Sequence, residues 1–254
     1  MIRPTGEFYC GTSNVVLPVA GKAQFPIAYR SKSRLHYYAT LFNSVEINST
    51  FYKIPMPKTV ARWSDDVPEH FRFTFKLWRG MTHVRELVCE PADVGRYMEA
   101  INMVGTKKGC LLVQFPASIK ASYMRHVQRL LQDILQSGKA DGWALAVEFR
   151  DRSWYRDEVY EMLEQYRATI VIHDMPRSAT PEIDMQTDTV YLRFHGERGD
   201  YKGDYENDIL RGYADKVKDH IAEGKNVYAY FNNTLGAAVH NAMMLQALGS
   251  ATIK

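Results

Sequence analysis

The chain repeatedly places a charged or amide side chain at the carboxyl end of a short apolar run. Depending on their type, such residues can transfer protons, bind anions or donate hydrogen bonds. If the runs are parallel strands, their carboxyl ends meet on one face of the fold, where α/β proteins bind ligands. The sequence therefore predicts a polar ligand site at this face. Its residues are Glu46 with Asn48, Lys76, Gln114, Glu148 with Arg150, His173, Arg193 with His195, and Asn232.

Two of these residues are the candidates for acid–base catalysis. Glu148 ends one run, and the pKa of a partly desolvated glutamate near cations can be tuned in either direction. His195 ends another run and can transfer a proton near neutral pH. Each residue also has a structural alternative, because Glu148 could pair with Arg193 and His195 could cap its strand.

Cations at the same face predict a negatively charged ligand. Arg150 and Arg193 can hold a carboxylate or phosphate through two parallel hydrogen bonds, and Lys76 adds a point charge. The buried carboxylates Glu46 and Glu148 also need cationic partners, so salt bridges that merely close the barrel are the alternative for any single member. The full set predicted to bind substrate is Thr12, Glu46, Asn48, Tyr52, Lys76, Gln114, Arg150, Arg193, Tyr230, Asn232 and Asn233.

A metal site is an alternative use of the same region. Glu148, His173, Asp174 and His195 lie on or beside three consecutive runs, and carboxylate with imidazole suits Zn, Mn or Fe. The arginines expected at this face would repel a divalent cation. We therefore expect neither a metal nor an organic cofactor, and we keep a divalent metal as the less favoured alternative.

Eight runs rich in Val, Ile, Phe or Tyr predict strands, and segments with helical periodicity separate most of them. The runs span 8–12, 45–51, 71–76, 109–115, 143–149, 168–173, 189–195 and 226–231, and the helical segments span 34–42, 59–66, 91–103, 123–136, 157–166, 208–221 and 236–248. This alternation over ~250 residues predicts one (β/α)8 TIM barrel, with residues 1–254 as a single domain. Two connections differ, because 13–33 is unusually long and 174–188 is predicted to be a loop in place of a helix.

The composition is that of a soluble globular protein. The 254 residues are 46% hydrophobic, and a formal net charge of +3 is too small for a dedicated nucleic-acid module. The cysteines Cys10, Cys89 and Cys110 are odd in number and widely spaced, which predicts a reducing compartment. Because the N-terminus resembles no signal peptide and no long apolar segment follows, we expect a cytoplasmic protein that does not span a membrane.

Several motifs, taken together, resemble one known family. They are GTS at 11–13, FNSVEINSTFY at 42–52, FTFK at 73–76, TH at 82–83, LVQFP at 112–116, AVEFR at 146–150 with SW at 153–154, YLRFHG at 191–196 and YFNN at 230–233. They cover nearly the whole chain in order and resemble the YecE-like family, TIM barrels known as domain of unknown function 72. The chain departs from the family pattern at Asn14-Val15, where Gly-Trp is usual, at Asp151, where His is usual, and at Thr234, where an acidic residue is common. The resemblance implies the barrel fold but no reaction.

Three functional hypotheses follow from these residues. The leading one is an enzyme without organic cofactor that binds a small anionic substrate (phosphorylated, carboxylated or sugar-like) at the barrel mouth and uses Glu148 and His195 for proton transfer. The second is a nucleic-acid-binding protein or phosphodiesterase, in which the same basic residues and the loop 198–205 contact phosphates. The third is a barrel that binds a ligand or partner without turnover. P-loop, G-x-G-x-x-G, G-x-S-x-G and H-E-x-x-H motifs are absent, which excludes the standard NTPase, dinucleotide-binding, esterase and zincin classes.

Overall fold

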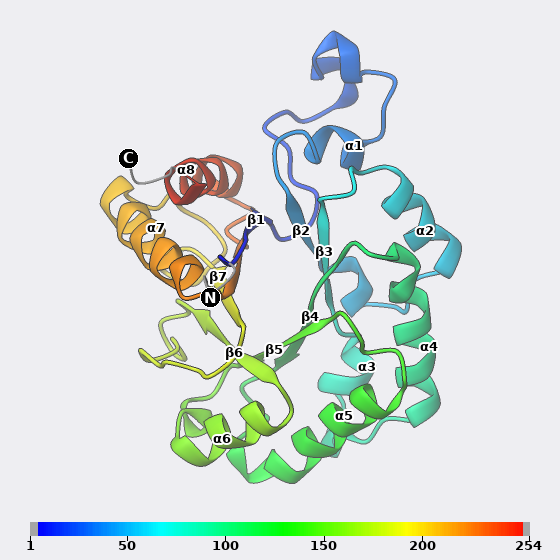
Figure 1. The fold of residues 1–254 in the computed structure, drawn as a ribbon, viewed down its shortest axis with the longest axis vertical. Coiled ribbons are helices and arrows are strands. Elements are labelled where there is room, and N and C mark those ends of the chain that lie inside the picture. Colours follow the sequence, from blue (N-terminus) through cyan, green and yellow to red (C-terminus); the bar gives the residue numbers. More distant parts are fainter. Residues whose placement is uncertain (1–4, 251–254) are drawn as a thin grey trace.

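The computed structural model describes residues 5–250, in which eight parallel strands form a barrel surrounded by helices (Figure 1). The strands are β1 Phe8–Thr12, β2 Ser44–Ile47, β3 Arg72–Lys76, β4 Lys108–Phe115, β5 Ala144–Phe149, β6 Ala168–His173, β7 Thr189–Phe194 and β8 Asn226–Phe231. The helices are α1 Arg34–Tyr38, α2 Pro57–Asp65, α3 Arg79–Thr82, α4 Pro91–Ile101, α5 Met124–Gln136, α6 Asp157–Gln165, α7 Asn207–Ala222 and α8 Ala238–Ser250. The (β/α)8 barrel predicted from the sequence is confirmed.

The barrel is nearly closed at the seam where its first and last paired strands, β1 and β2, meet. Neighbouring strands pair in the order β1-β8-β7-β6-β5-β4-β3-β2, and one backbone bridge, from Ser13 to Glu46, joins the two ends among the described residues. The hydroxyl of Tyr38 strengthens this seam by donating to the carbonyl of Ser44 at 3.1 Å. Gly11 is required here, because a β-carbon on it would lie 2.0 Å from the Ser44 carbonyl oxygen.

Alternation along the strands separates two apolar clusters. The barrel interior is filled by Tyr9, Cys110, Leu112, Ala146, Val171, Tyr191, Tyr228 and Tyr230. The opposite face of each strand packs against the helices in a larger core, in which α5 buries Val127, Leu130, Leu131 and Ile134. Polar side chains that follow the interior residues by two positions must therefore also point inward, which places them at the carboxyl end of the barrel.

The predicted strand 45–51 is wrong at its end, because β2 stops at Ile47 and the residues Ser49–Phe51 form a 3-10 turn. The hydroxyl of Thr50 holds this turn by donating to the carbonyls of Ile47 at 3.0 Å and Lys76 at 2.8 Å. The predicted helix 34–42 is also shorter and ends at Tyr38. The segment 174–188 contains no helix, as predicted, whereas the short helix α3 after β3 is not predicted by the sequence pattern.

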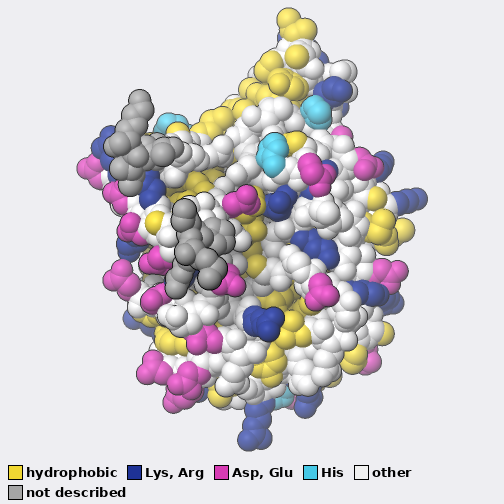
Figure 2. Space-filling view, viewed as in Figure 1, with side chains coloured by type: hydrophobic (Ala, Val, Ile, Leu, Met, Phe, Trp, Pro, Cys, Tyr) yellow, Lys and Arg dark blue, Asp and Glu magenta, His cyan; other side chains and the backbone are white. Residues whose placement is uncertain are grey.

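The long connection after β1 projects from the barrel (blue, at the top of Figure 1). It contains two 3-10 turns, Lys22–Gln24 and Ile27–Tyr29. Hydrophobic side chains gather on this projection (Figure 2), where Ile27 is 83% exposed. None of the helices within residues 5–250 is both long and apolar enough to cross a membrane.

Candidate functional site

A buried ionic network lies across the carboxyl end of the barrel and is centred on Arg193. The guanidinium of Arg193 donates from Nε and Nη2 to the two carboxylate oxygens of Glu46, at 2.9 Å each, and from Nη1 to Glu148 at 3.1 Å. Ser13 and Tyr191 also donate to Glu46, at 2.6 and 2.5 Å. Every oxygen and nitrogen at this centre therefore has a protein partner, as a buried charge requires.

His195 joins this network as a neutral acceptor. Arg150 Nη2 and Arg193 Nη1 both lie 2.8 Å from His195 Nε2, so this nitrogen carries no proton and accepts from them. The proton is therefore on Nδ1, which faces Asp174 Oδ1 at 3.3 Å. Burial lowers the pKa of His195 to about 4, although the hydrogen bond with Asp174 opposes this effect. The imidazole is neutral near pH 7.

Both carboxylates of the network are ionised. Burial raises the pKa of Glu148, but Arg150 and Arg193 outweigh it and hold that pKa well below its usual range. Burial likewise raises the pKa of Glu46, and Arg193 brings it below its usual value. The prediction that these carboxylates pair with cations is confirmed. Arg150 and Arg193 therefore balance the charges of Glu46 and Glu148.

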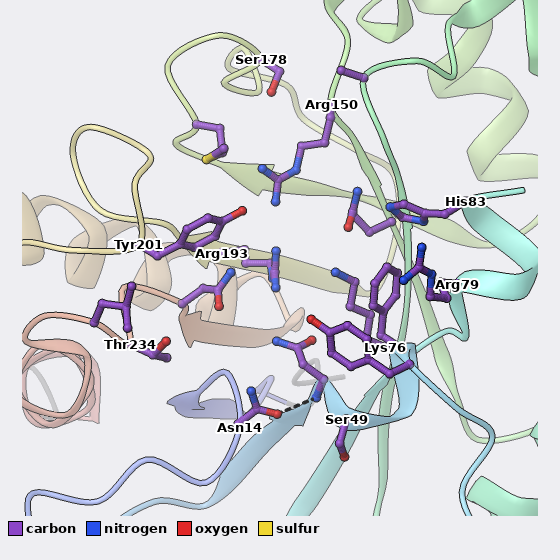
Figure 3. Close-up of a pocket in the computed structure, with 18 of the residues that line it drawn as sticks. Asn14, Ser49, Lys76, Arg79, His83, Arg150, Ser178, Arg193, Tyr201 and Thr234 are labelled. Atoms are coloured by element: carbon purple, nitrogen blue, oxygen red, sulfur yellow. Dashed lines mark hydrogen bonds between the residues drawn. The ribbon is translucent and has the colours of Figure 1, made fainter.

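A cavity of about 930 Å³ adjoins the network at the barrel mouth. Its positively charged lining residues are Lys76, Arg79, Arg150, Arg177 and Arg193, and no carboxylate of the described chain lines it. Figure 3 shows Arg150, Lys76 and Tyr201 pointing from separate segments into the same space. The salt bridges found between residues 5 and 250 include none to Lys76, Arg79 or Arg177.

One wall of the cavity is organised around the ring of Phe51. Lys76 Nζ lies 4.3 Å from the ring centroid, Arg79 Cζ lies 5.9 Å from it, and the two ring centroids of His83 and Phe51 are 4.8 Å apart. Burial and then the charge of Arg193 lower the pKa of Lys76 to about 7. Burial, Lys76 and Arg79 lower the pKa of His83 to about 4. This wall therefore presents two nitrogen bases whose proton affinity is reduced.

Neutral polar side chains complete the lining. They are Asn14, Asn48, Ser49, Tyr52, Gln114, Ser178, Tyr201, Asn232 and Thr234. The Oδ1 atom of Asn48 is buried without a hydrogen-bond partner in the described part of the chain. The backbone N–H of Asn48 donates to Oδ1 of Asn14 at 3.0 Å, which is the dashed line in Figure 3. Such amides and hydroxyls can orient hydroxyl, carbonyl or phosphate oxygens of a ligand.

Comparison with known proteins identifies the family. The family described as "Protein of unknown function DUF72" matches residues 10–253. The chain belongs to the DUF72 family. It is 27% identical to the UPF0759 protein YunF of Bacillus subtilis (strain 168) over 261 residues, which cover 88% of this chain and 89% of YunF. The resemblance read from the motifs is thereby confirmed.

Two solved structures of DUF72 family proteins show the same fold. The protein from Enterococcus faecalis V583 superposes with a TM-score of 0.79 at 20% identity, covering 97% of both chains. The protein from Thermotoga maritima MSB8 has a TM-score of 0.74 at 26% identity and covers 95% of this chain and 98% of its own. The fold is therefore that of the family, and the site must be interpreted from its residues.

Seven of the residues predicted to bind substrate line the cavity, namely Asn48, Tyr52, Lys76, Gln114, Arg150, Arg193 and Asn232. Four others, Thr12, Glu46, Tyr230 and Asn233, do not line it and bond to protein groups instead. The hydroxyl of Tyr230 lies 2.5 Å from Ser44 Oγ, and Asn233 Nδ2 donates to Asn241 at 2.9 Å. Their buried side chains therefore stabilise the barrel end and its loops.

The predicted acid–base pair is brought together but lies behind the cavity wall. Glu148 Oε1 is 3.9 Å from His195 Nε2, and neither residue is among those that line the cavity. Their role in proton transfer stays a prediction. The alternative metal set is not assembled, because His173 Nε2 lies 2.9 Å from the carbonyl of Phe149 and no three His, Cys, Asp or Glu side chains in residues 5–250 converge on one point.

The sequence pattern missed two cations of the cavity. Arg79 lies in the short helix α3, and Arg177 lies in the loop 174–188. The length of that loop was the available signal, since long loops at this end of a barrel form rims. Asn14 and Thr234 also line the cavity.

Proposed function

We propose that this protein is an enzyme that binds a small anionic molecule in the cavity at the carboxyl end of the barrel. One observation carries the proposal: the cavity is lined by Lys76, Arg79, Arg150, Arg177 and Arg193 without a carboxylate from the described residues. A volume of about 930 Å³ lies within the range of small-molecule sites. Phosphorylated or carboxylated compounds, including acidic sugars, fit this charge and size.

The charge of the wall supports an anionic ligand. Glu46 and Glu148 balance Arg193 and Arg150, whereas Arg79 and Arg177 add positive charge that no described salt bridge offsets, and Lys76 adds more when it is protonated. Like charges repel more strongly in a partly desolvated cavity than in water. An anion relieves this repulsion, and a guanidinium can hold a carboxylate or phosphate through two hydrogen bonds.

The catalytic part of the proposal is based on where the cavity lies in the barrel and on two basic side chains in the cavity wall. Active sites of TIM-barrel enzymes lie at this end of the barrel. Lys76 and His83 line the cavity, and their lowered pKa values leave nitrogen lone pairs available near neutral pH. Glu148 and His195 lie one layer deeper, where they hold Arg150 and Arg193.

Anion binding is tested by titrating the protein with inorganic phosphate in a calorimeter at low salt. Arg177→Ala should weaken binding about tenfold, because a hydrogen bond to a charged group contributes about 1.5 kcal/mol. Arg125→Ala is the matched control, because Arg125 is also an exposed arginine and lies on α5 outside the cavity. Equal affinities of the two variants would place the anion elsewhere and contradict the proposal.

Turnover is tested by following mixtures of phosphorylated and carboxylated metabolites by NMR. A compound consumed by the wild type and not by Lys76→Met or His83→Asn would establish the enzyme. A ligand that binds and stays unchanged would identify a binding barrel instead. Oligonucleotide binding that falls steeply with salt, without phosphate binding, would favour the nucleic-acid hypothesis.

A further inference from the structure

Lys76 differs from the arginines of the cavity because its amine nitrogen can lose a proton and act as a nucleophile. It is the last residue of β3, and among the described residues its backbone carbonyl accepts from Thr50 and Tyr97, whereas no side-chain hydrogen bond or salt bridge involves its Nζ. The amine lies 4.3 Å from the centroid of the Phe51 ring, so an apolar surface covers one side of it. Its other side faces the cavity, as the side chain does in Figure 3.

The surroundings of the amine favour its neutral form. Burial is the largest effect, and the charges of Arg193 and Arg150 add to it. Glu46 and Glu148 oppose it, but the network places their oxygens against guanidinium groups rather than against the amine. A lysine that is desolvated and close to other cations is the kind that acts as a nucleophile on carbonyl compounds.

We propose that Lys76 forms an imine with a carbonyl carbon of the anionic ligand. The lone pair of Nζ attacks the carbonyl carbon and forms a C–N bond, giving a carbinolamine. The former carbonyl oxygen takes up one proton from solvent in addition to that released by the nitrogen, the C–O bond breaks, and water leaves. The product is a protonated imine, and no oxidant or reductant is needed.

The substrate class follows from the groups around the amine. Arg79 lies against the same Phe51 ring as Lys76, and Arg177 lines the same cavity. A carboxylate or phosphate held by Arg79, which shares the Phe51 ring with Lys76, would bring a neighbouring carbonyl group close to Nζ. This inference rests on the proposed anion site and narrows its ligand to a 2-oxo acid or a phosphorylated ketone or aldehyde.

Reductive trapping tests the imine directly. The wild-type protein is incubated with pyruvate, dihydroxyacetone phosphate or uncharged dihydroxyacetone, each with sodium cyanoborohydride at pH 7, and adducts are located by peptide mass spectrometry. We expect one adduct on Lys76, formed at least tenfold faster than on the exposed Lys53. The charged compound that reacts fastest identifies the anionic group, and dihydroxyacetone should react more slowly than either.

Lys76→Arg is the control variant, because it keeps the positive charge and removes the nucleophile. It should bind phosphate but form no adduct within the cavity. Trapping on wild-type Lys76 that is no faster than on Lys53 overturns the inference, and this measurement needs no variant. Phosphate should also slow trapping, both by occupying the site and by stabilising the protonated amine.

Failure of the imine and failure of the anion site give different results. If phosphate binds and Arg177→Ala weakens it, but no carbonyl compound labels Lys76, the inference is wrong and the proposed function stands. If phosphate does not bind and all three carbonyl compounds label Lys76 equally, the amine is nucleophilic but the anion site is wrong. If neither occurs, both are wrong.

Discussion

Replacing Lys76 with Met should stabilise the protein at low pH, and the gain should shrink as the pH rises. Burial and Arg193 lower the pKa of the Lys76 amine to about 7 in the folded protein, from the ordinary lysine value of 10.5. The unfolded chain therefore binds more protons than the folded one between about pH 7 and 10.5. By linkage, the stability of the wild type rises with pH through this window and is lowest below it. Met removes the titrating group and with it this dependence.

The size of the effect follows from the same two values. One pKa unit corresponds to 1.36 kcal/mol. In the folded protein the amine of Lys76 loses its proton near pH 7, whereas in the unfolded chain it keeps its proton up to about pH 9. The two states therefore differ by one proton over about two pH units of the interval from pH 6 to pH 9. The wild type should therefore gain about 2.5 kcal/mol of unfolding free energy over this interval relative to Lys76→Met.

The assay is urea unfolding of both proteins at pH 6 and pH 9. Subtracting the pH dependence of the variant from that of the wild type removes the other titrating groups, as long as they do not interact with Lys76. Lys53→Met is the control, because Lys53 is exposed and should leave the pH dependence unchanged. A pH dependence that is the same in the wild type and Lys76→Met would show that the amine is ordinarily solvated, and would refute the reasoning.

Three further predictions concern the network and the wall. Arg193→Leu should destabilise the protein by about 3–5 kcal/mol in urea unfolding, because Glu46 and Glu148 lose their shared buried partner; an unchanged midpoint would contradict this. Tyr230→Phe should cost about 1–2 kcal/mol and leave phosphate affinity unchanged, since this hydroxyl bonds within the barrel and does not line the cavity; weaker phosphate binding would return Tyr230 to the site. His83→Asn should reduce the acid sensitivity of the fold by about 1–2 kcal/mol between pH 7 and 5, because the imidazole pKa is lowered from 6.5 to about 4 and the unfolded chain takes up the proton first; equal acid denaturation curves would count against it.

The strand pattern predicted the barrel and its mouth, because two rules act on every strand. Side chains alternate between the interior and the helices, and parallel strands all end on one side. Glu46, Glu148 and Arg193 were therefore placed correctly at one end of the barrel. Alternation cannot distinguish a side chain that faces the cavity from one that faces another side chain across the barrel, since both point inward.

This ambiguity explains why the two residues predicted to transfer protons lie behind the cavity wall instead of lining it. Glu148 lies in line with the polar ends of the strands, but the long side chain of Arg193 reaches across and covers it. Only the lengths and rotamers of neighbouring side chains decide this, and no period in the sequence records them. Arg79 and Arg177 lie outside the strands, where periodicity gives no direction at all.

The buried network is better explained by positioning than by stability. A buried salt bridge loses so much hydration that an apolar replacement is often equally stable. In this protein the network holds two guanidinium groups at fixed places. Glu46 accepts from Arg193 through both carboxylate oxygens, and Glu148 accepts from both Arg150 and Arg193. The same arginines lower the proton affinity of Lys76. The network therefore fixes two guanidinium groups beside an amine, and the proposed anion site and the proposed imine both depend on that arrangement.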